Sequence, residues 1–228
     1  MKNNSKLTML IQLTGGTFPS GGFSQSFGLE TYVANGLVNN GETFTEFAGV
    51  YIDNVIMKCE GPIACEAYRL AKEWDREKLL DLETLSNAVK LTKESREASL
   101  RTGKAVLRIM ADVVEDKRLA ELRTMSGRKG MTYPVVYGTI CSLLDIDLED
   151  SIEAFIYNTV NTLVQSGIKL IPLGNTEAQK IVFELHEYIR NAVESVMDRD
   201  VKDISNFCPA LDIAGIIHED LRVRLYMS

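Results

Sequence analysis

Hydrophobic positions in the second half of the chain recur at helical spacing. From Glu149 onward they are separated by steps of three, one and four residues, which place them on one face of a long amphipathic helix. These positions are Ile152, Phe155, Ile156, Val160, Leu163, Val164, Ile168 and Ile171. The pattern returns after a short break and predicts a second long helix, with apolar positions at Ile181, Val182, Leu185, Ile189, Val193 and Val196.

The break between these two helices has the composition of a turn. Pro172 disfavours helical geometry at Ile171, and Gly174 suits a turn. Asn175 or Thr176 can cap the N-terminus of the following helix. The sequence therefore predicts that one helix ends near Ile171 and that the next begins just beyond Gly174.

The first half of the chain also shows helical periodicity, and alternating strand patterns are scarce. Helices are predicted over residues 44–58, 62–74, 76–91, 94–114 and 133–144. The predicted breaks are Asn40-Gly41, Gly61-Pro62 and Gly127 to Gly130. Because no repeat or interdomain linker is present, we predict an all-α fold with about eight to ten helices in a single domain, residues 1–228.

The N-terminal segment, residues 1–36, is rich in glycine and phenylalanine. Residues 14–36 contain six of the sixteen glycines of the chain, together with Phe18, Phe23 and Phe27. We interpret the glycines as positions where the backbone makes a close approach, and the phenylalanines as buried anchors. Such a segment suits a close protein contact or the lining of a passage between subunits. A turn that joins two core helices is the alternative.

Composition and charge exclude several classes of function. The net charge of −7 disfavours nucleic-acid binding, which needs a basic surface. No run of about 18 apolar residues predicts a membrane span, and the first residues lack the apolar core of a signal peptide, so we expect a cytoplasmic protein. The four cysteines have no metal-binding or redox spacing and are expected to be reduced core thiols; they are Cys59, Cys65, Cys141 and Cys208.

Motifs for catalysis and for cofactor or metal binding are incomplete. Gly22-Phe23 stands where a phosphate-binding loop needs Lys-Ser/Thr, so the sequence predicts no bound nucleotide. Arginine follows His186 and His218 at the position of the second ligand of a zinc-protease helix. We interpret His186 as a helix-packing residue. A small helical serine hydrolase that uses Ser24 or Ser26 with a distant histidine remains an alternative.

The last twenty residues, 209–228, form a distinct tail. Apolar residues alternate there with arginines, as in Arg222-Val223-Arg224-Leu225. The tail either docks on its own domain or becomes ordered only against a partner, with apolar anchors and arginine hydrogen bonds.

Four ordered blocks of the sequence resemble the UreF family of urease accessory proteins. They are FPSGGFSQSFGLE near the N-terminus, REASLRTGKAVLR (residues 96–108), IPLGNTEAQK (residues 171–180) and PALDIAGIIHEDLRVRLYMS (residues 209–228). The blocks lie in the order and spacing of the family and cover essentially the whole chain. The resemblance implies an all-helical, dimeric protein that is not an enzyme.

The family pattern also marks candidate partner-binding residues. In the first block these are Pro19, Gly21, Gly22, Phe23, Ser24, Gly28, Leu29 and Glu30. Around the third block they are Lys169, Pro172, Gly174 and Gln179. In the tail they are Pro209, Asp212, His218, Glu219, Arg222, Arg224, Tyr226 and Ser228. Two positions depart from the pattern: Gln25 replaces an aromatic residue or histidine, and Tyr226 replaces phenylalanine, which adds a hydroxyl group to an aromatic anchor.

The partners implied by the resemblance are UreD (also called UreH), the GTPase UreG and the urease apoprotein. The expected function is that of an adaptor that bridges UreD and UreG while nickel is inserted into urease. Nickel and GTP would be handled by the complex through those partners, with no cofactor bound by this chain. We expect Lys169 to communicate with UreG and the tail to contact UreD. The alternatives to the adaptor are the serine hydrolase and a generic regulatory helical dimer.

Overall fold

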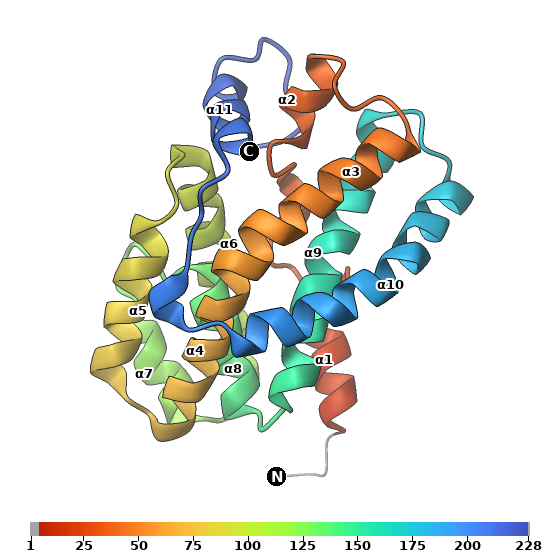
Figure 1. The fold of residues 1–228 in the computed structure, drawn as a ribbon. Helices are drawn as coiled ribbons and strands as arrows, with labels where there is room; N and C mark the ends of the chain where they lie inside the picture. Colours follow the sequence, from red (N-terminus) through yellow and green to blue (C-terminus); the bar gives the residue numbers. More distant parts are fainter. Residues whose placement is uncertain (1–4, 228) are drawn as a thin grey trace.

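The computed structural model describes residues 5–227, except for the side chain of Phe23. Throughout this range the regular structure is helical, which confirms the predicted all-α class (Figure 1). The elements are α1 (Lys6–Thr14), η1 (Gly22–Ser24), α2 (Leu29–Ala34), α3 (Gly41–Tyr51), η2 (Ile52–Glu60), α4 (Gly61–Glu73), α5 (Arg76–Ala88), α6 (Lys93–Val113), α7 (Lys117–Met125), α8 (Tyr133–Leu143), α9 (Leu148–Leu170), α10 (Asn175–Asp198), η3 (Val201–Asp203) and α11 (Pro209–His218). No helix of the described range is long and apolar enough to cross a membrane.

Helices α4, α8, α9 and α10 form the centre of the fold, with α4 packed most extensively on α8. The other helices cover this centre, and α2 and α11 pack together at one end of the molecule, opposite α1 (Figure 1). Gly138 allows α8 to cross close to α4, because a Cβ atom there would lie 2.1 Å from the carbonyl oxygen of Ala64. The α4–α8 contact therefore depends on a glycine in the middle of α8.

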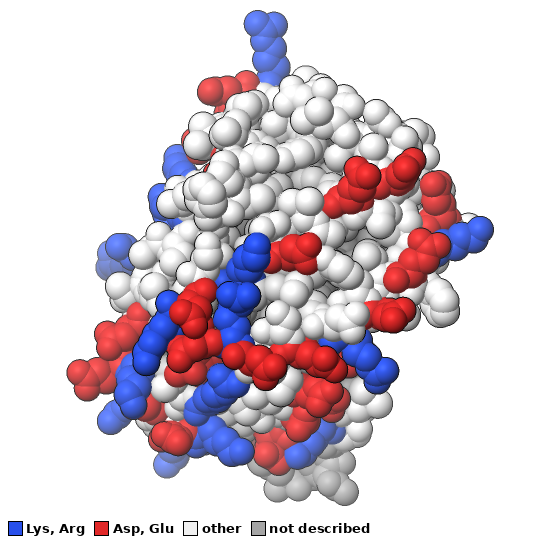
Figure 2. All heavy atoms as spheres, viewed as in Figure 1, with Lys and Arg blue, Asp and Glu red and all other residues white. Residues whose placement is uncertain are grey.

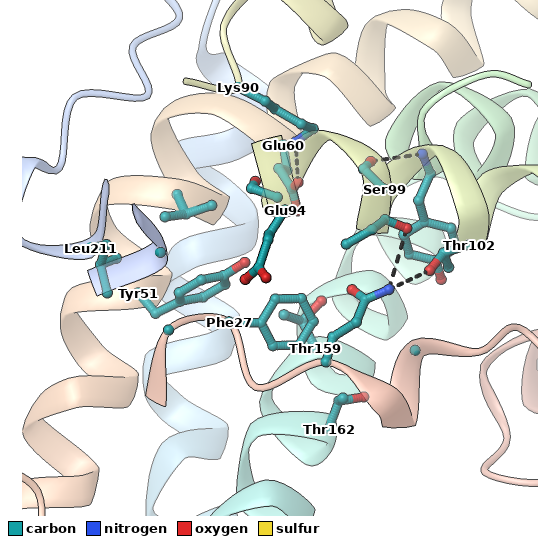
Figure 3. A pocket seen from close by; sticks show the side chains of 18 of the residues that line it. Phe27, Tyr51, Glu60, Lys90, Glu94, Ser99, Thr102, Thr159, Thr162 and Leu211 are labelled. Carbon is teal, nitrogen blue, oxygen red and sulfur yellow. Dashed lines mark hydrogen bonds and ion pairs between the residues drawn. The ribbon is translucent and has the colours of Figure 1, made fainter. Parts of the chain in front are cut away.

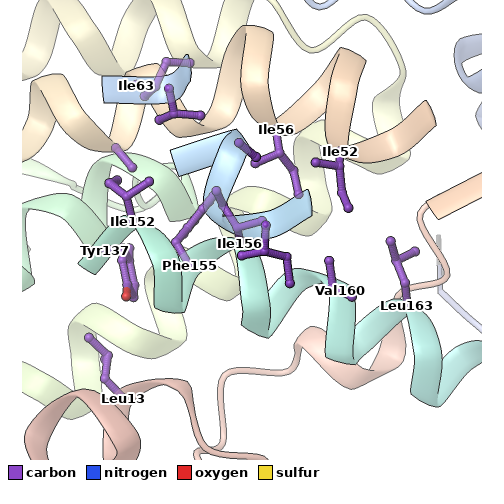
Figure 4. Close-up of a cluster of buried hydrophobic side chains, with 14 of the residues drawn as sticks. Leu13, Ile52, Ile56, Ile63, Tyr137, Ile152, Phe155, Ile156, Val160 and Leu163 are labelled. Carbon is purple, nitrogen blue, oxygen red and sulfur yellow. The ribbon is translucent and has the colours of Figure 1, made fainter. Parts of the chain in front are cut away.

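The predicted apolar stripe of α9 lies in the core. Ile152, Phe155 and Ile156 are almost fully buried and face residues of the long helical run that contains Ile52 and Ile56 (Figure 4). Burying each such side chain contributes about 1.5–3 kcal/mol to folding. The pattern of steps of three and four residues thus identified the central packing face of the molecule.

The predicted break at Gly61-Pro62 is wrong, because α3, η2 and α4 continue into one another without a turn. The middle part, η2, is a π-helical segment. Pro62 cannot donate a backbone hydrogen bond to the carbonyl of Lys58, and the backbone N–H of Ser205 donates to that carbonyl instead, at 2.8 Å. Gly61 serves packing, since a Cβ there would lie 2.7 Å from the side chain of Val196.

The predicted break after α9 is confirmed in position but not in its capping. Ile171 has the extended geometry expected before proline, with φ −126° and ψ 162°. Gly174 occupies the N-cap position of α10, which has no side-chain cap. Asn175 and Thr176 already belong to the first turn, so neither is the predicted cap.

The four cysteines are free thiols, as predicted, and they differ in exposure. Cys59, Cys65 and Cys141 are buried, whereas Cys208 is partly exposed. Burial raises the pKa of Cys59 to about 11 and the pKa values of Cys65 and Cys141 to about 12. Because the thiolate is the reactive form, these three side chains are protected both by burial and by protonation.

We therefore expect a maleimide reagent at about pH 7.5 to label one thiol of the native chain rapidly. All four should be labelled after unfolding. Mass spectrometry of the intact chain counts the labels, and a Cys208→Ser variant should lose the rapid label. Rapid labelling of that variant would contradict the burial of the other three thiols.

Candidate functional site

The glycine-rich segment between α1 and α2 is a loop that lies against α6 and α9. Gly21 and Gly28 have positive φ values of 80° and 86°, a conformation that favours glycine, and Phe27 between them has φ 56°. A Cβ atom on Gly21 would meet nothing within 4 Å. The prediction of close backbone approach is therefore wrong at Gly21, where the conformation of the turn is what requires glycine.

Gln25 fastens this loop to the helical core. Its side-chain amide donates to the carbonyl of Ala98 at 3.3 Å and to the hydroxyl of Thr102 at 3.0 Å, both on α6. The hydroxyl of Ser166 on α9 donates to the Gln25 carbonyl at 3.4 Å. The residue that departs from the family pattern is thus a buried structural anchor.

The phenylalanines of the loop have different surroundings. Phe18 is buried, as predicted for an anchor. The ring of Phe27 is partly buried, 5.4 Å from the ring of Tyr51. The prediction for Phe23 falls on a side chain outside the described residues.

The C-terminal tail lies against this loop and against α2. The carboxylate of Glu30 accepts hydrogen bonds from the backbone N–H groups of Leu225 and Tyr226, at 2.7 and 3.1 Å. The N–H of Met227 donates to the carbonyl of Ser24 at 2.8 Å. Two segments separated by almost the whole chain therefore meet through backbone groups of the tail, which bond the Glu30 carboxylate and the Ser24 carbonyl.

Four ionisable side chains hold the tail, and we call them the tail clasp: Glu30, Glu94, His218 and Arg224. His218 is fully buried at the end of α11, where Nε2 lies 2.9 Å from Glu30 and Nδ1 lies 2.7 Å from Glu94. The guanidinium of Arg224 donates to the second oxygen of Glu94 at 3.0 Å. The clasp joins α2, α6, α11 and the tail.

Tyr226 is buried within its own chain next to the clasp. The ammonium group of Lys169, in the last turn of α9, lies 5.8 Å from the centre of its ring, a cation–π contact. The hydroxyl of Tyr226 has no hydrogen-bond partner in the described part of the chain. The additional hydroxyl relative to phenylalanine therefore lies inside this chain.

The structure brings together many, but not all, of the predicted site residues. Ser24, Gly28, Leu29, Glu30, Lys169, His218, Arg224 and Tyr226 lie at or beside the contact between loop and tail. Other predicted residues are exposed outside the clasp, and they are Pro19, Gly21, Pro172, Gly174, Gln179, Pro209, Glu219 and Arg222. Gly22 is partly buried, and Ser228 lies outside the described residues.

A cavity of about 120 Å³ lies between the loop, α6, α9 and α11. Its wall includes Asp212, whose pKa is raised by burial. Figure 3 shows the ion pair of Lys90 and Glu60 at one side and the neighbouring rings of Phe27 and Tyr51 at another. The cavity has room for several water molecules.

Sequence reasoning missed Lys90, Glu60 and Glu94. Lys90 is fully buried, and its ammonium group donates to the carboxylate of Glu60. Burial alone lowers the pKa of Lys90, but the negative charge and hydrogen bond of Glu60 outweigh this effect, so the pKa is raised. Lysine and glutamate at these positions read as ordinary helix surface, and no local pattern distinguishes them.

Exposed apolar side chains gather at the end of the molecule that carries the tail. We call them the tail surface: Ile213, Ile216, Ile217, Val223, Leu225 and Met227. In Figure 2 charged side chains are sparser at this end, where they lie mainly along the margin near α11, than in the opposite half, where lysine, arginine and acidic side chains crowd together. Exposed apolar residues gathered at one end of a molecule are typical of protein interaction sites.

Neither histidine is placed as a catalytic base for Ser24. The hydroxyl of Ser24 donates to the carbonyl of Gly21 at 2.8 Å, while both ring nitrogens of His218 face carboxylates. His186 on α10 is exposed, and its ring lies 6.3 Å from the ring of Tyr157 on α9 and 5.4 Å from that of Phe183. It therefore contacts a neighbouring helix, as predicted, but at the surface of the molecule. Among residues 5–227, no group of three or more His, Cys, Asp and Glu side chains could hold a metal ion.

Comparison with known proteins finds a matching family and several relatives that match over most of the chain. The UreF family model matches residues 38–186. The chain is 34% identical over 206 residues to the urease accessory protein UreF of Sporosarcina pasteurii, a match that covers 88% of this chain and all of the relative. It is 31% identical to the urease accessory protein UreF of Actinobacillus pleuropneumoniae serotype 5b over 98% of this chain and 99% of the relative. The urease accessory protein UreF of Bacillus sp. strain TB-90 is 29% identical over 98% of this chain and 100% of its own length.

Proposed function

Because this chain belongs to the UreF family of urease accessory proteins, we propose that it is an adaptor in nickel-dependent urease maturation. The family consists of accessory proteins rather than enzymes. In the proposed role the chain bridges UreD (UreH) and the GTPase UreG in the cytoplasm, as a homodimer, during insertion of nickel into the urease apoprotein. Nickel and GTP are handled by the partners, and this chain supplies shaped helical surfaces.

The observation that carries this proposal is the tail surface. Its six side chains are exposed by 42% to 82%, although each is strongly apolar. They lie on α11 and the adjoining tail, which the clasp and backbone hydrogen bonds hold against the body of the molecule. A preformed apolar surface loses little conformational entropy on binding, which favours tight association. We assign this surface to UreD.

Lys169 is the proposed contribution to UreG binding. It lies at the C-terminal end of α9, is exposed, and is held near the tail by its contact with Tyr226. A charge at the margin of an apolar surface affects the rate and specificity of association more than its strength. This position would allow one end of the molecule to contact both partners.

We expect Val223→Glu and Leu225→Glu to weaken UreD binding by about thirtyfold or more each, because a charge replaces an exposed apolar contact. Both side chains are more than two-thirds exposed, so the fold should be retained. The measurement is co-purification of the chain with UreD and UreG, followed by titration of the purified components.

The matched control is Phe183→Glu, which places the same charge at an equally exposed apolar position on α10. It should leave UreD binding unchanged. If the two tail variants bind UreD as strongly as the control, the tail surface is not the UreD site. Turnover of an ester by the purified chain, abolished by Ser24→Ala, would favour the hydrolase over the adaptor.

A further inference from the structure

The tail clasp has an unusual requirement for protons. A neutral imidazole has one N–H group and one bare nitrogen. Both ring nitrogens of His218 lie within 2.9 Å of a carboxylate oxygen, one from Glu30 and one from Glu94. In either neutral tautomer, one carboxylate would face a lone pair at hydrogen-bond distance. Only the imidazolium ion can donate to both.

The charges around His218 lead to the same conclusion. Glu30 on α2 and Glu94 on α6 bring two negative charges, and Arg224 on the tail brings one positive charge. His218 itself is completely buried, and the side chains of both glutamates are at most 12% exposed. A protonated His218 makes the clasp neutral, whereas a neutral one leaves an unpaired charge that is costly to bury. The other charged residues near the end of α11, Glu219, Asp220 and Arg222, are exposed.

We propose that His218 is the positioning residue of the tail, and that its imidazolium ion is required for the tail to stay docked. Loss of one proton then releases the tail from α2 and the N-terminal loop. When the tail is released, Val223 and Leu225 are no longer held in place beside the exposed isoleucines of α11. This inference concerns the chain alone, so its test does not depend on the partners assigned above.

The direct test is the protonation state of His218 in the intact wild-type chain. Long-range ¹H–¹⁵N spectra distinguish an imidazolium, with two protonated nitrogens, from either neutral tautomer. We expect two protonated nitrogens for His218 in the docked state. A single protonated nitrogen would overturn the proposal, and this measurement needs no variant.

The second test follows tail docking with pH, from the backbone amide signals of Leu225 and Tyr226. If opening releases one proton, the ratio of open to docked tail should increase by up to about tenfold per pH unit above the point where a free imidazole is neutral. His218→Gln keeps a polar side chain without a titrating proton. It should show a larger open fraction that does not change over this pH range.

The chain provides its own control, because His186 is its only other histidine. His186 is exposed on α10, so His186→Gln should retain the pH dependence of the wild type. A pH dependence that persists in His218→Gln, or that disappears in His186→Gln, would overturn the proposal.

Discussion

Replacement of Lys90 by methionine is expected to lower the free energy of unfolding by about 3–5 kcal/mol, because Glu60 would keep its charge without its buried partner. The Lys90 side chain is 2% exposed and that of Glu60 is 15% exposed, so both groups are withdrawn from bulk solvent. Methionine fills a similar volume, which limits the contribution of a cavity. Denaturant unfolding followed by helical circular dichroism measures the loss.

Two further variants separate the charge effect from packing. The double variant Lys90→Met/Glu60→Leu should recover much of the loss, since an apolar pair often replaces a buried ion pair at little cost. Lys6→Met removes the exposed pair with Asp145 and should have a much smaller effect. A loss for Lys90→Met no larger than that for Lys6→Met would contradict the structural role of the buried pair.

The pH dependence of this stabilisation has a definite direction. Burial alone lowers the pKa of Lys90, but Glu60 reverses the shift and raises it above its ordinary value. A raised folded-state pKa gives a stabilisation that is complete below about pH 10.4 and is lost as the pH rises through the folded-state value. The deficit of Lys90→Met should therefore persist throughout the neutral range.

The helices could be predicted from the sequence because their apolar stripes are long and regular. The stripe on α9, from Ile152 to Val164, required only the period of the helix. No break occurs at Gly61-Pro62, because the N–H of Ser205, far along the chain, donates to the Lys58 carbonyl that Pro62 leaves without a donor. Proline does remove a hydrogen bond from the helix, but sequence close to the proline does not show that Ser205 replaces it.

The family pattern marks residues of the loop and of the tail in two separate blocks of the sequence. It does not show that the two segments contact each other. Glu30 and His218 are 188 positions apart, and neither has a local pattern that names the other. Glu94 was not among the predicted partner-binding residues, although it forms hydrogen bonds with both His218 and Arg224. Pairing of charged residues depends on the arrangement of helices, which periodicity alone does not specify.

Substitution of Glu30 by alanine is expected to release the tail without unfolding the helical core. Glu30 accepts hydrogen bonds from two backbone N–H groups of the tail and lies 2.9 Å from Nε2 of His218, so its removal leaves these three groups without their partner. Removing one partner of a buried charge pair costs about 3–5 kcal/mol, which corresponds to an opening constant about a hundredfold or more higher.

Hydrogen exchange at the amide of Met227, at fixed pH, gives the most informative measurement of this release. That N–H donates to the carbonyl of Ser24, a bond that the substitution itself does not remove. Faster exchange at Met227 in Glu30→Ala would therefore report release of the tail as a unit. Glu219→Ala removes an exposed carboxylate next to His218 and should leave this exchange unchanged. Equal exchange in wild type and Glu30→Ala would mean that Glu30 contributes nothing to docking, and that the buried side chain of Tyr226 and the contacts of Glu94 hold the tail in place.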